Sequence, residues 1–225
     1  MIKHVFLDID DTIFDFPWSE SHALRSAYAE LGLPMTDEMY EHYHRINRRW
    51  WQVHERGEVA RDVMLVERHR EMFREFSLDA DPVALEKAYR RNLGIGFQYM
   101  PHAEEVLHYL RPKYKLYIAS NGVAQTQYSR LASANLMNFF DGLFISEEIG
   151  ALKPEPAFFS YMFSKIPDFD PEEAIIVGDS LMSDILGGIR AGIKTVWCNI
   201  AGREGNPDVH PDYEIRDLRE LKNIL

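Results

Sequence analysis

The sequence predicts an α/β protein with a parallel sheet, helices on both faces of the sheet and an inserted all-helical cap subdomain. Two observations predict the sheet: short strand-like segments alternate with helix-like ones, and the strand-like segments are continuously apolar. A third predicts the insert, because residues 16–97 read as successive helices with no strand between them. The expected division is therefore a core of residues 1–15 and 98–225 and a cap of residues 16–97.

In the core, each strand is expected to be followed by a helix. Strands are expected at 3–8, 114–120, 142–146, 174–179 and 194–199, with a short sixth strand within the tail 213–225. Helices are expected at 102–110, at 123–134, from about Pro154, at 183–192 and at the end of the tail. Gly192 is placed to end the fourth of these helices.

In the cap, polar residues that commonly precede helices mark where helices begin. Ser19 and Thr36 are candidate N-caps for the first two helices, and Asp81 followed by Pro82 is a typical start for the fourth. The four expected helices end near Gly32, Gly57, Phe76 and Gly94.

Composition limits the class of function. The formal net charge of -11 argues against binding of nucleic acid polymers or anionic membranes, which needs clustered positive charge. A small phosphorylated metabolite remains a possible partner, since a metal ion and a few local cations can attract it. The single cysteine, Cys198, permits no intrachain disulfide and is expected to be buried. With no signal-like or membrane-spanning segment, the expected location is the cytoplasm, and the sequence gives no oligomeric state.

Polar residues follow four of the expected strands, at the edge where parallel α/β sheets bind ligands. The first strand ends in Asp8, Asp10 and Asp11, three carboxylates that repel one another unless a cation is bound or one of them is protonated. The other strands are followed by a polar turn, an ammonium group and a further acid, namely Ser120-Asn121-Gly122, Lys153 and Asp179. Each group alone is commonplace, but the ordered set predicts a single site.

This ordered set resembles the haloacid dehalogenase superfamily. Its four motifs match "DIDDT", "ASNG", "ALKPEP" and "GDSLMSD" in order, and the helical insert lies where that superfamily carries a cap of the first type. The resemblance implies a Rossmann-like core. It also separates two chemistries, because dehalogenases lack an acid two positions after the nucleophile and phosphatases need one to protonate the leaving oxygen. Asp10 is present here, which favours hydrolysis of phosphate esters.

The resemblance implies a role for each motif residue. Asp8 would be the nucleophile that forms an aspartyl-phosphate, and Asp10 the general acid and then the general base. Mg²⁺ would be held by Asp8, Asp179 and the carbonyl of Asp10. The phosphoryl group would be bound by Ser120, Asn121 and Lys153, with Thr12 orienting Asp10 and Asp184 orienting Lys153 or a metal-bound water. The side chain of Asp11 is expected only to bond backbone within the loop.

The cap stretch 43–70 resembles that of bacterial pyrimidine 5'-nucleotidases, which favours a nucleoside 5'-monophosphate as substrate. Within it, Trp51 is a candidate to stack on a base and Asn47 a further specificity residue. Trp50 and Trp51 are adjacent on a helix and point about 100° apart, so both cannot face one pocket. The alternatives are a sugar-phosphate or phosphoglycolate phosphatase, a phosphoglucomutase, a 2-haloacid dehalogenase and a non-catalytic nucleotide-binding module.

Overall fold

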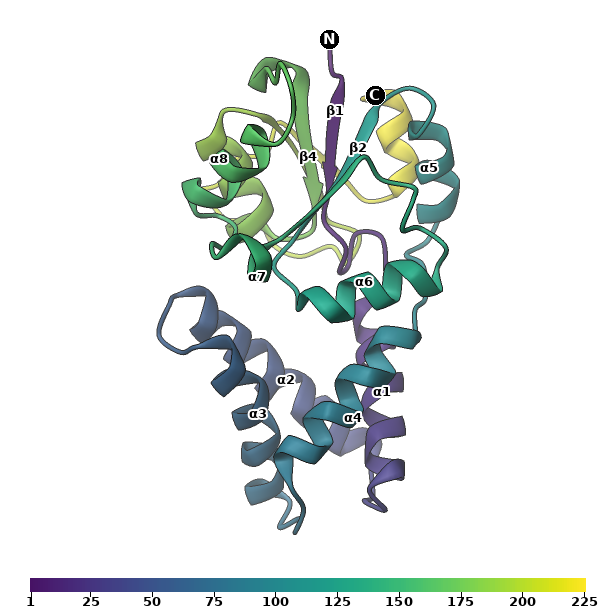
Figure 1. Ribbon diagram of the computed structural model, residues 1–225, viewed down its shortest axis with the longest axis vertical. Coiled ribbons are helices and arrows are strands. Elements are labelled where there is room, and N and C mark those ends of the chain that lie inside the picture. The colour runs from purple at the N-terminus through teal and green to yellow at the C-terminus, as the bar shows by residue number, and fades with distance from the viewer. The chain divides into compact units, whose positions relative to one another are not determined.

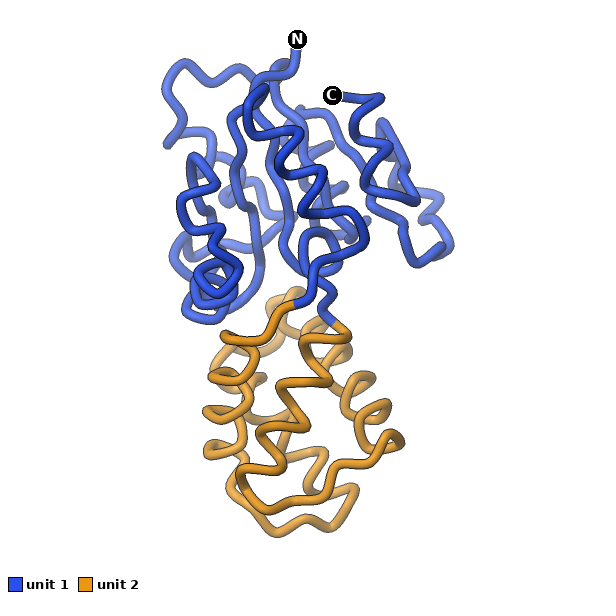
Figure 2. Tube along the Cα trace, turned by 90° about the vertical axis from the view of Figure 1, so that its right-hand side faces the viewer, with its two compact units in different colours: residues 1–16, 98–225 blue, residues 17–97 orange.

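The computed structural model describes all residues from 1 to 225, and they form two compact units (Figure 2). The core unit comprises residues 1–16 and 98–225, and the cap unit comprises residues 17–97. Phe16 thus belongs to the core unit, one residue beyond the expected boundary. None of the helices is both long enough and apolar enough to span a membrane.

The core unit is built on a six-stranded, fully parallel sheet with the strand order β3-β2-β1-β4-β5-β6 (Figure 1). This confirms the predicted α/β class. In the centre of the sheet, Val5 lies opposite Leu116 of β2 and Ile175 of β4, and all three are buried. The strands are β1 (His4–Leu7), β2 (Lys115–Ser120), β3 (Gly142–Ile145), β4 (Ala174–Gly178), β5 (Lys194–Cys198) and β6 (Tyr213–Ile215).

Helices cover both faces of this sheet (Figure 1). On one face, Phe6 of β1 and Ile176 of β4 pack in one cluster with Phe158, Phe159 and Met162 of α8. On the other, α5 lies beside the 3₁₀ helix η3 at the C-terminus. The helices are α5 (Ala103–Leu110), α6 (Ala124–Ser133), α7 (Ser146–Ile149), α8 (Pro156–Ser164), η1 (Pro171–Glu173), η2 (Leu181–Ile185), α9 (Leu186–Ala191) and η3 (Leu218–Asn223).

Four details of the core differ from expectation or were not expected. The short helix α7 was not predicted, and the last helix is a 3₁₀ helix rather than an α-helix. The segment after β4 begins with a turn of π-helix, η2, before α9 ends at Gly192 as predicted. His102, which precedes α5, has φ +66°, a left-handed conformation that side chains rarely adopt.

The cap unit contains four helices, as expected: α1 (Phe16–Glu30, which begins one residue before the unit), α2 (Asp37–Glu55), α3 (Arg61–Glu75) and α4 (Pro82–Ile95). The predicted N-caps of α2 and α4 are confirmed, since the side chains of Thr36 and Asp81 accept hydrogen bonds from the backbone of Met39 and Val83. The predicted N-cap at Ser19 is wrong. Ser19 is buried inside α1, which begins at Phe16 because Pro17 suits the first turn of a helix.

Candidate active site

The carboxyl ends of β2, β1 and β4 bring the first, second and fourth motifs together. These three strands are neighbours in the sheet and are all parallel, so Ser120 at the end of β2 lies at the same edge as Asp8 and Asp179, which follow β1 and β4. Asp8 is anchored in the sheet through its backbone N–H, which donates to the carbonyl of Val177 on β4 at 3.0 Å. The candidate active site lies at this edge.

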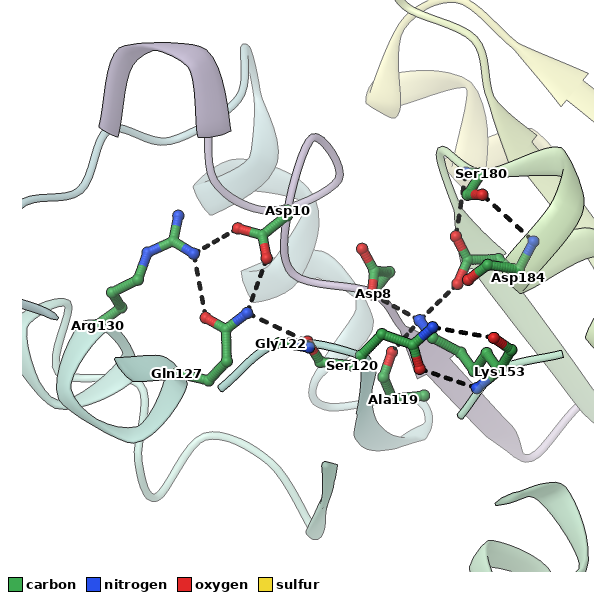
Figure 3. A network of polar contacts seen from close by, with 12 residues as sticks. Asp8, Asp10, Ala119, Ser120, Gly122, Gln127, Arg130, Lys153, Ser180 and Asp184 are labelled. Carbon is green, nitrogen blue, oxygen red and sulfur yellow. Dashed lines mark hydrogen bonds and ion pairs between the residues drawn. The ribbon is translucent and has the colours of Figure 1, made fainter. Parts of the chain in front are cut away.

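Lys153 lies at the centre of the site (Figure 3). Its Nζ is 2.6 Å from Oδ1 of Asp8 and 2.6 Å from Oδ1 of Asp184, and it also donates to the carbonyl of Ala119. The ammonium group is 1% exposed. Burial alone would lower the pKa of Lys153, but the two carboxylates outweigh burial and raise it. Lys153 is therefore a permanent cation between two acids.

Three carboxylates gather around one point in a way that suits a divalent cation. Oxygen atoms of Asp8, Asp179 and Asp184 all lie within 4.8 Å of one another. Burial raises the pKa of Asp8 well above its usual value, even though Lys153 opposes the shift. Burial, followed by the charges of Asp184 and Asp11, raises the pKa of Asp179 to about 7. Hard carboxylate oxygens short of positive charge fit Mg²⁺, which would relieve this repulsion.

The approach of Asp184 to this cluster depends on a glycine. A Cβ atom on Gly178 would lie 2.3 Å from the carboxyl carbon of Asp184, so only glycine fits at the end of β4. Asp184 is on the π-helical turn η2, and its Oδ2 accepts a hydrogen bond from the backbone N–H of Ser180 at 3.1 Å. The Ser180 side chain in turn caps η2 by accepting from Ser183. Asp184 thus contacts Lys153 directly, in keeping with the role of orienting it.

The two polar residues after β2 are used differently. The Oγ of Ser120 accepts from the backbone N–H of Gly122 at 3.1 Å, within the turn expected to bind phosphate. The amide of Asn121 instead forms two hydrogen bonds with the backbone of Lys153, at 2.9 and 2.8 Å. Because its side chain is engaged there, Asn121 ties the second motif to the third, which does not agree with a contact between that side chain and a phosphoryl oxygen.

Asp10 turns its carboxylate toward α6 (Figure 3). Gln127 donates to Oδ2 at 2.7 Å, and Arg130 forms an ion pair with Oδ1. The expected orienting residue, Thr12, is buried and its hydroxyl has no hydrogen-bond partner, so it does not hold the Asp10 carboxylate. Neither Gln127 nor Arg130 was predicted from the sequence. A glutamine and an arginine three positions apart on a helix after the second motif were the available signal.

The prediction for Asp11 is confirmed. Its Oδ1 accepts a hydrogen bond from the backbone N–H of Phe16 at 3.0 Å, and its own backbone has φ +55°. Aspartate is among the few residues that tolerate this conformation. Burial raises the pKa of Asp11 to about 6.

Arg203, in the loop between β5 and β6, was also missed. It donates to Oδ2 of Asp179 at 2.6 Å, while the indole N–H of Trp197 donates to the Asp179 carbonyl at 2.9 Å. The buried side chain of Asn199 fixes the backbone of Arg203 through two hydrogen bonds, of 2.8 and 2.7 Å. The strand β5 and the loop after it thus hold Asp179 at both its carboxylate and its carbonyl.

The two candidate specificity residues of the cap differ in their surroundings. Asn47 is buried among α2, α3 and α1, donating to Glu20 at 2.5 Å and accepting from Arg68 at 2.6 Å. Both ends of its amide are occupied, which does not agree with the expectation that Asn47 contacts substrate. Trp51 is partly buried and packs edge-on against His54, 5.9 Å between ring centroids. Trp50 donates to Glu71 at 2.9 Å within the cap.

Known proteins similar to this chain belong to the family that the four motifs predict. Residues 2–192 match the family described as haloacid dehalogenase-like hydrolase. YfnB of Bacillus subtilis, named a HAD hydrolase, is 40% identical over 223 residues, covering 99% of this chain and 95% of YfnB. Its crystal structure, described as bound to magnesium, has a TM-score of 0.95 at 39% identity and covers 100% of this chain and 98% of that one. The chain belongs to the haloacid dehalogenase-like hydrolase family.

Two further relatives have names that state an activity. PynA of Streptococcus pneumoniae, a pyrimidine 5'-nucleotidase, is 31% identical over 99% of this chain and 97% of its own length. YjjG of Escherichia coli, also a pyrimidine 5'-nucleotidase, is 30% identical over 98% of this chain and 96% of its own length. This chain is therefore an enzyme of the hydrolase class, similar over its whole length to pyrimidine 5'-nucleotidases.

Proposed function

We propose that the protein is a Mg²⁺-dependent phosphomonoesterase that acts through an aspartyl-phosphate and prefers pyrimidine nucleoside 5'-monophosphates. One observation carries the proposal. A carboxylate suited to nucleophilic attack, Asp8, is bonded to the buried cation Lys153 and grouped with Asp179, while a second acid, Asp10, is held at the same edge of the sheet. A dehalogenase has no need of that second acid, and neither has a non-catalytic binding module.

In the first half-reaction, the Asp8 carboxylate would attack phosphorus and form an acyl-phosphate bond as the bond to the ester oxygen breaks. Asp10, in its protonated form, would give its proton to the leaving oxygen. Lys153 and the backbone N–H groups after Ser120 would stabilise the charge on the phosphoryl oxygens.

In the second half-reaction, Asp10 would take a proton from the water that attacks the phosphorus of the aspartyl-phosphate. The bond to Asp8 then breaks, which releases inorganic phosphate and restores the carboxylate. Asp8 and Asp179 would hold Mg²⁺, with the carbonyl of Asp10 as a further ligand. When bound, the ion supplies positive charge to the phosphoryl oxygens and offsets the repulsion between them and the carboxylates.

The preference for pyrimidine nucleotides rests on PynA and YjjG, whose alignments include the whole cap. Trp51 is the proposed base-stacking residue, since its indole packs on His54 and makes no hydrogen bond of the kind that holds Trp50 to Glu71. Asn47 would act indirectly, by fixing α2, the helix that carries Trp51.

The test is phosphate release with Mg²⁺ and with EDTA. The substrates are UMP, dUMP, dTMP, AMP, glucose 1- and 6-phosphates, phosphoglycolate and p-nitrophenyl phosphate. We expect release that depends on Mg²⁺ and is fastest with the pyrimidine nucleotides. Faster release from sugar phosphates or phosphoglycolate would retain the chemistry and reject the nucleotide preference, and exchange between the two glucose phosphates would indicate a mutase. No Mg²⁺-dependent release from any of them would reject the proposal.

A further inference from the structure

Two side chains of α6 converge on the carboxylate of Asp10. Gln127 Nε2 lies 2.7 Å from Oδ2, and the guanidinium of Arg130 pairs with Oδ1, so each carboxylate oxygen has its own donor (Figure 3). Residues three apart on a helix project from the same face, which is why both side chains reach the same group. Asp10 lies in the loop after β1, where its backbone forms an isolated β-bridge with that of Phe14.

The two donors are themselves fixed by burial. Gln127 is 2% exposed and Arg130 is 1% exposed. Arg130 donates to Oε1 of Gln127 at 3.0 Å, and its guanidinium carbon lies 5.1 Å from the centre of the Phe14 ring. A buried guanidinium is stable only when paired, so the contact with Asp10 constrains both partners. The side chain of Asp10 is 30% exposed and so remains accessible from solvent.

Gln127 also connects Asp10 to the phosphate-binding turn. The same Nε2 donates to the Oγ of Ser120 at 3.1 Å. Gly122 leaves the space for this contact, because a Cβ there would lie 2.3 Å from Nε2 of Gln127. The amide group of Gln127 therefore links Ser120, at the end of β2, to Asp10, in the loop after β1.

We propose that Gln127 and Arg130 are positioning residues, which fix the direction of the Asp10 carboxyl group relative to Ser120. The inference rests on the proposed phosphomonoesterase function, in which Asp10 must meet the leaving oxygen and then the attacking water. A shift of about 1 Å in a catalytic group can cost about 100-fold in rate. Loss of either donor should therefore impair proton transfer more than it impairs substrate binding.

The first test is the variant Gln127→Met, which keeps the length of the side chain and removes the amide. We expect kcat for an alkyl phosphate such as UMP to fall about 10- to 100-fold, with KM changing by less than about 3-fold. With p-nitrophenyl phosphate, whose leaving group needs little protonation, the first half-reaction should be nearly unaffected, as measured by the rate of the nitrophenolate burst. Equal losses in both measurements would overturn the inference.

The second test distinguishes positioning of Asp10 from a general structural effect. If Gln127 acts through Asp10, Gln127→Met introduced into the Asp10→Asn background should cause less than about a 2-fold further loss with UMP. A purely structural role would give the same fold-loss in both backgrounds, and that result would overturn the inference.

Arg130 is tested by a matched pair. Arg130→Lys keeps a cation that can reach Asp10, whereas Arg130→Met leaves Asp10 without its cationic partner. Arg130→Lys should therefore retain more activity with UMP than Arg130→Met. Thr195→Val is the control for losing a buried hydrogen bond, because Thr195 lies in β5 and its hydroxyl bonds with Asp212 rather than with a proposed site residue. If Arg130→Met does not fold, the Gln127 measurements decide alone.

The outcomes separate this inference from the proposed function. If the unaltered protein releases no phosphate from any substrate, the proposed function is rejected and the inference with it. If the unaltered protein is active, but Gln127→Met loses activity equally with UMP and in the nitrophenolate burst, only the inference is rejected. A selective loss with UMP that disappears in the Asp10→Asn background supports both.

Discussion

Lys153 is a single buried cation shared by two buried carboxylates, Asp8 and Asp184, each 2.6 Å from its ammonium group. Asp179 adds a third acid to the same group. Removing one partner from a buried ion pair is costly because the remaining charge stays desolvated. Each charge in the site is therefore stabilised by the others. A substitution there changes the stability of the protein as well as its activity.

Asp8→Asn should abolish phosphate release while leaving the protein folded. The amide can still accept a hydrogen bond from Lys153 but cannot form the aspartyl-phosphate, so we expect a loss of at least about 1,000-fold. The measurement is kcat with UMP together with the circular dichroism spectrum. Turnover near that of the unaltered protein would show that Asp8 is not the nucleophile.

Lys153→Met should destabilise the core unit by about 3–5 kcal/mol, since Asp8 and Asp184 lose their shared cation. Urea unfolding at neutral pH measures this change. The control is the double variant Lys153→Met/Asp184→Asn, which removes one of the stranded charges and should recover part of the loss. Equal stability of Lys153→Met and the unaltered protein would contradict the shared-cation account.

Some residues of the site could be read from the sequence and others could not, for a physical reason. Asp8, Ser120 and Asp179 lie at or just after the carboxyl ends of strands, and parallel strands end at one edge, so their convergence follows from order alone. Gln127 projects from the side of a helix, and its direction depends on how α6 packs, which a strand-end rule does not address. For Thr12, the resemblance implied a contact with Asp10 that the side chain does not make.

At the scale of single elements, the loop between β5 and β6 is organised around Asp179. Asn199 fixes the loop backbone, and Arg203 and Trp197 hold Asp179 from one side. Residues that hydrogen-bond to a metal ligand, without contacting the metal themselves, commonly contribute about 10- to 100-fold to metal affinity. The loop is thus expected to contribute to binding of Mg²⁺ without contacting it.

Arg203→Met should weaken Mg²⁺ binding by about 10-fold, because Asp179 loses the group that orients its carboxylate. Calorimetric titration with Mg²⁺ measures the affinity directly, without relying on activity. Arg216→Met serves as a control, since Arg216 is an exposed arginine near the same loop that pairs with Glu214. Tighter binding of Mg²⁺ by Arg203→Met would instead show that the guanidinium competes with the ion.

The first residues of the cap helices show where N-cap preferences predict a helix start and where they do not. Thr36 and Asp81 were identified because both residue types are favoured N-caps, and Pro82 after Asp81 suits the first position of a helix. In α1, Ser19 and Pro17 compete, and proline at the first turn decides where the helix begins. The π-helical turn η2 was not foreseen, because it follows from the fit of Asp184 against Gly178 rather than from any preference of residues 181–185.

At the scale of the whole molecule, each of the two units has its own interior, and the interior of the cap is unusually polar. Arg68 and His69 of α3 both contact Glu86 of α4, at 2.8 Å each, and all three are buried. Tyr43 stacks on His69 at 5.2 Å between ring centroids. Burial lowers the pKa of His69 to about 4, although Glu86 opposes this shift.

The cap should therefore lose stability in mild acid. The folded-state pKa of His69, about 4, lies below the unfolded value of 6.5, so the unfolded state takes up a proton first as pH falls. The stability present above pH 6.5 is lost between that pH and about 4, by up to about 3 kcal/mol. Urea unfolding at a series of pH values gives the free energy of unfolding at each pH. Between pH 6.5 and 4 this free energy should fall less steeply for His69→Gln than for His210→Gln, which alters an exposed histidine. Identical slopes would contradict the assignment.

Cys198, the only cysteine, is buried in β5, and burial raises the pKa of its thiol. A neutral, enclosed thiol does not react readily with maleimides. Fluorescent dyes can therefore be attached at introduced cysteines without first replacing Cys198. Cysteines introduced at Val63 in the cap and Ile189 in the core, both exposed, would carry a donor and an acceptor dye. Energy transfer between the dyes would then measure the distance between the two labelled positions while Cys198 stays in place.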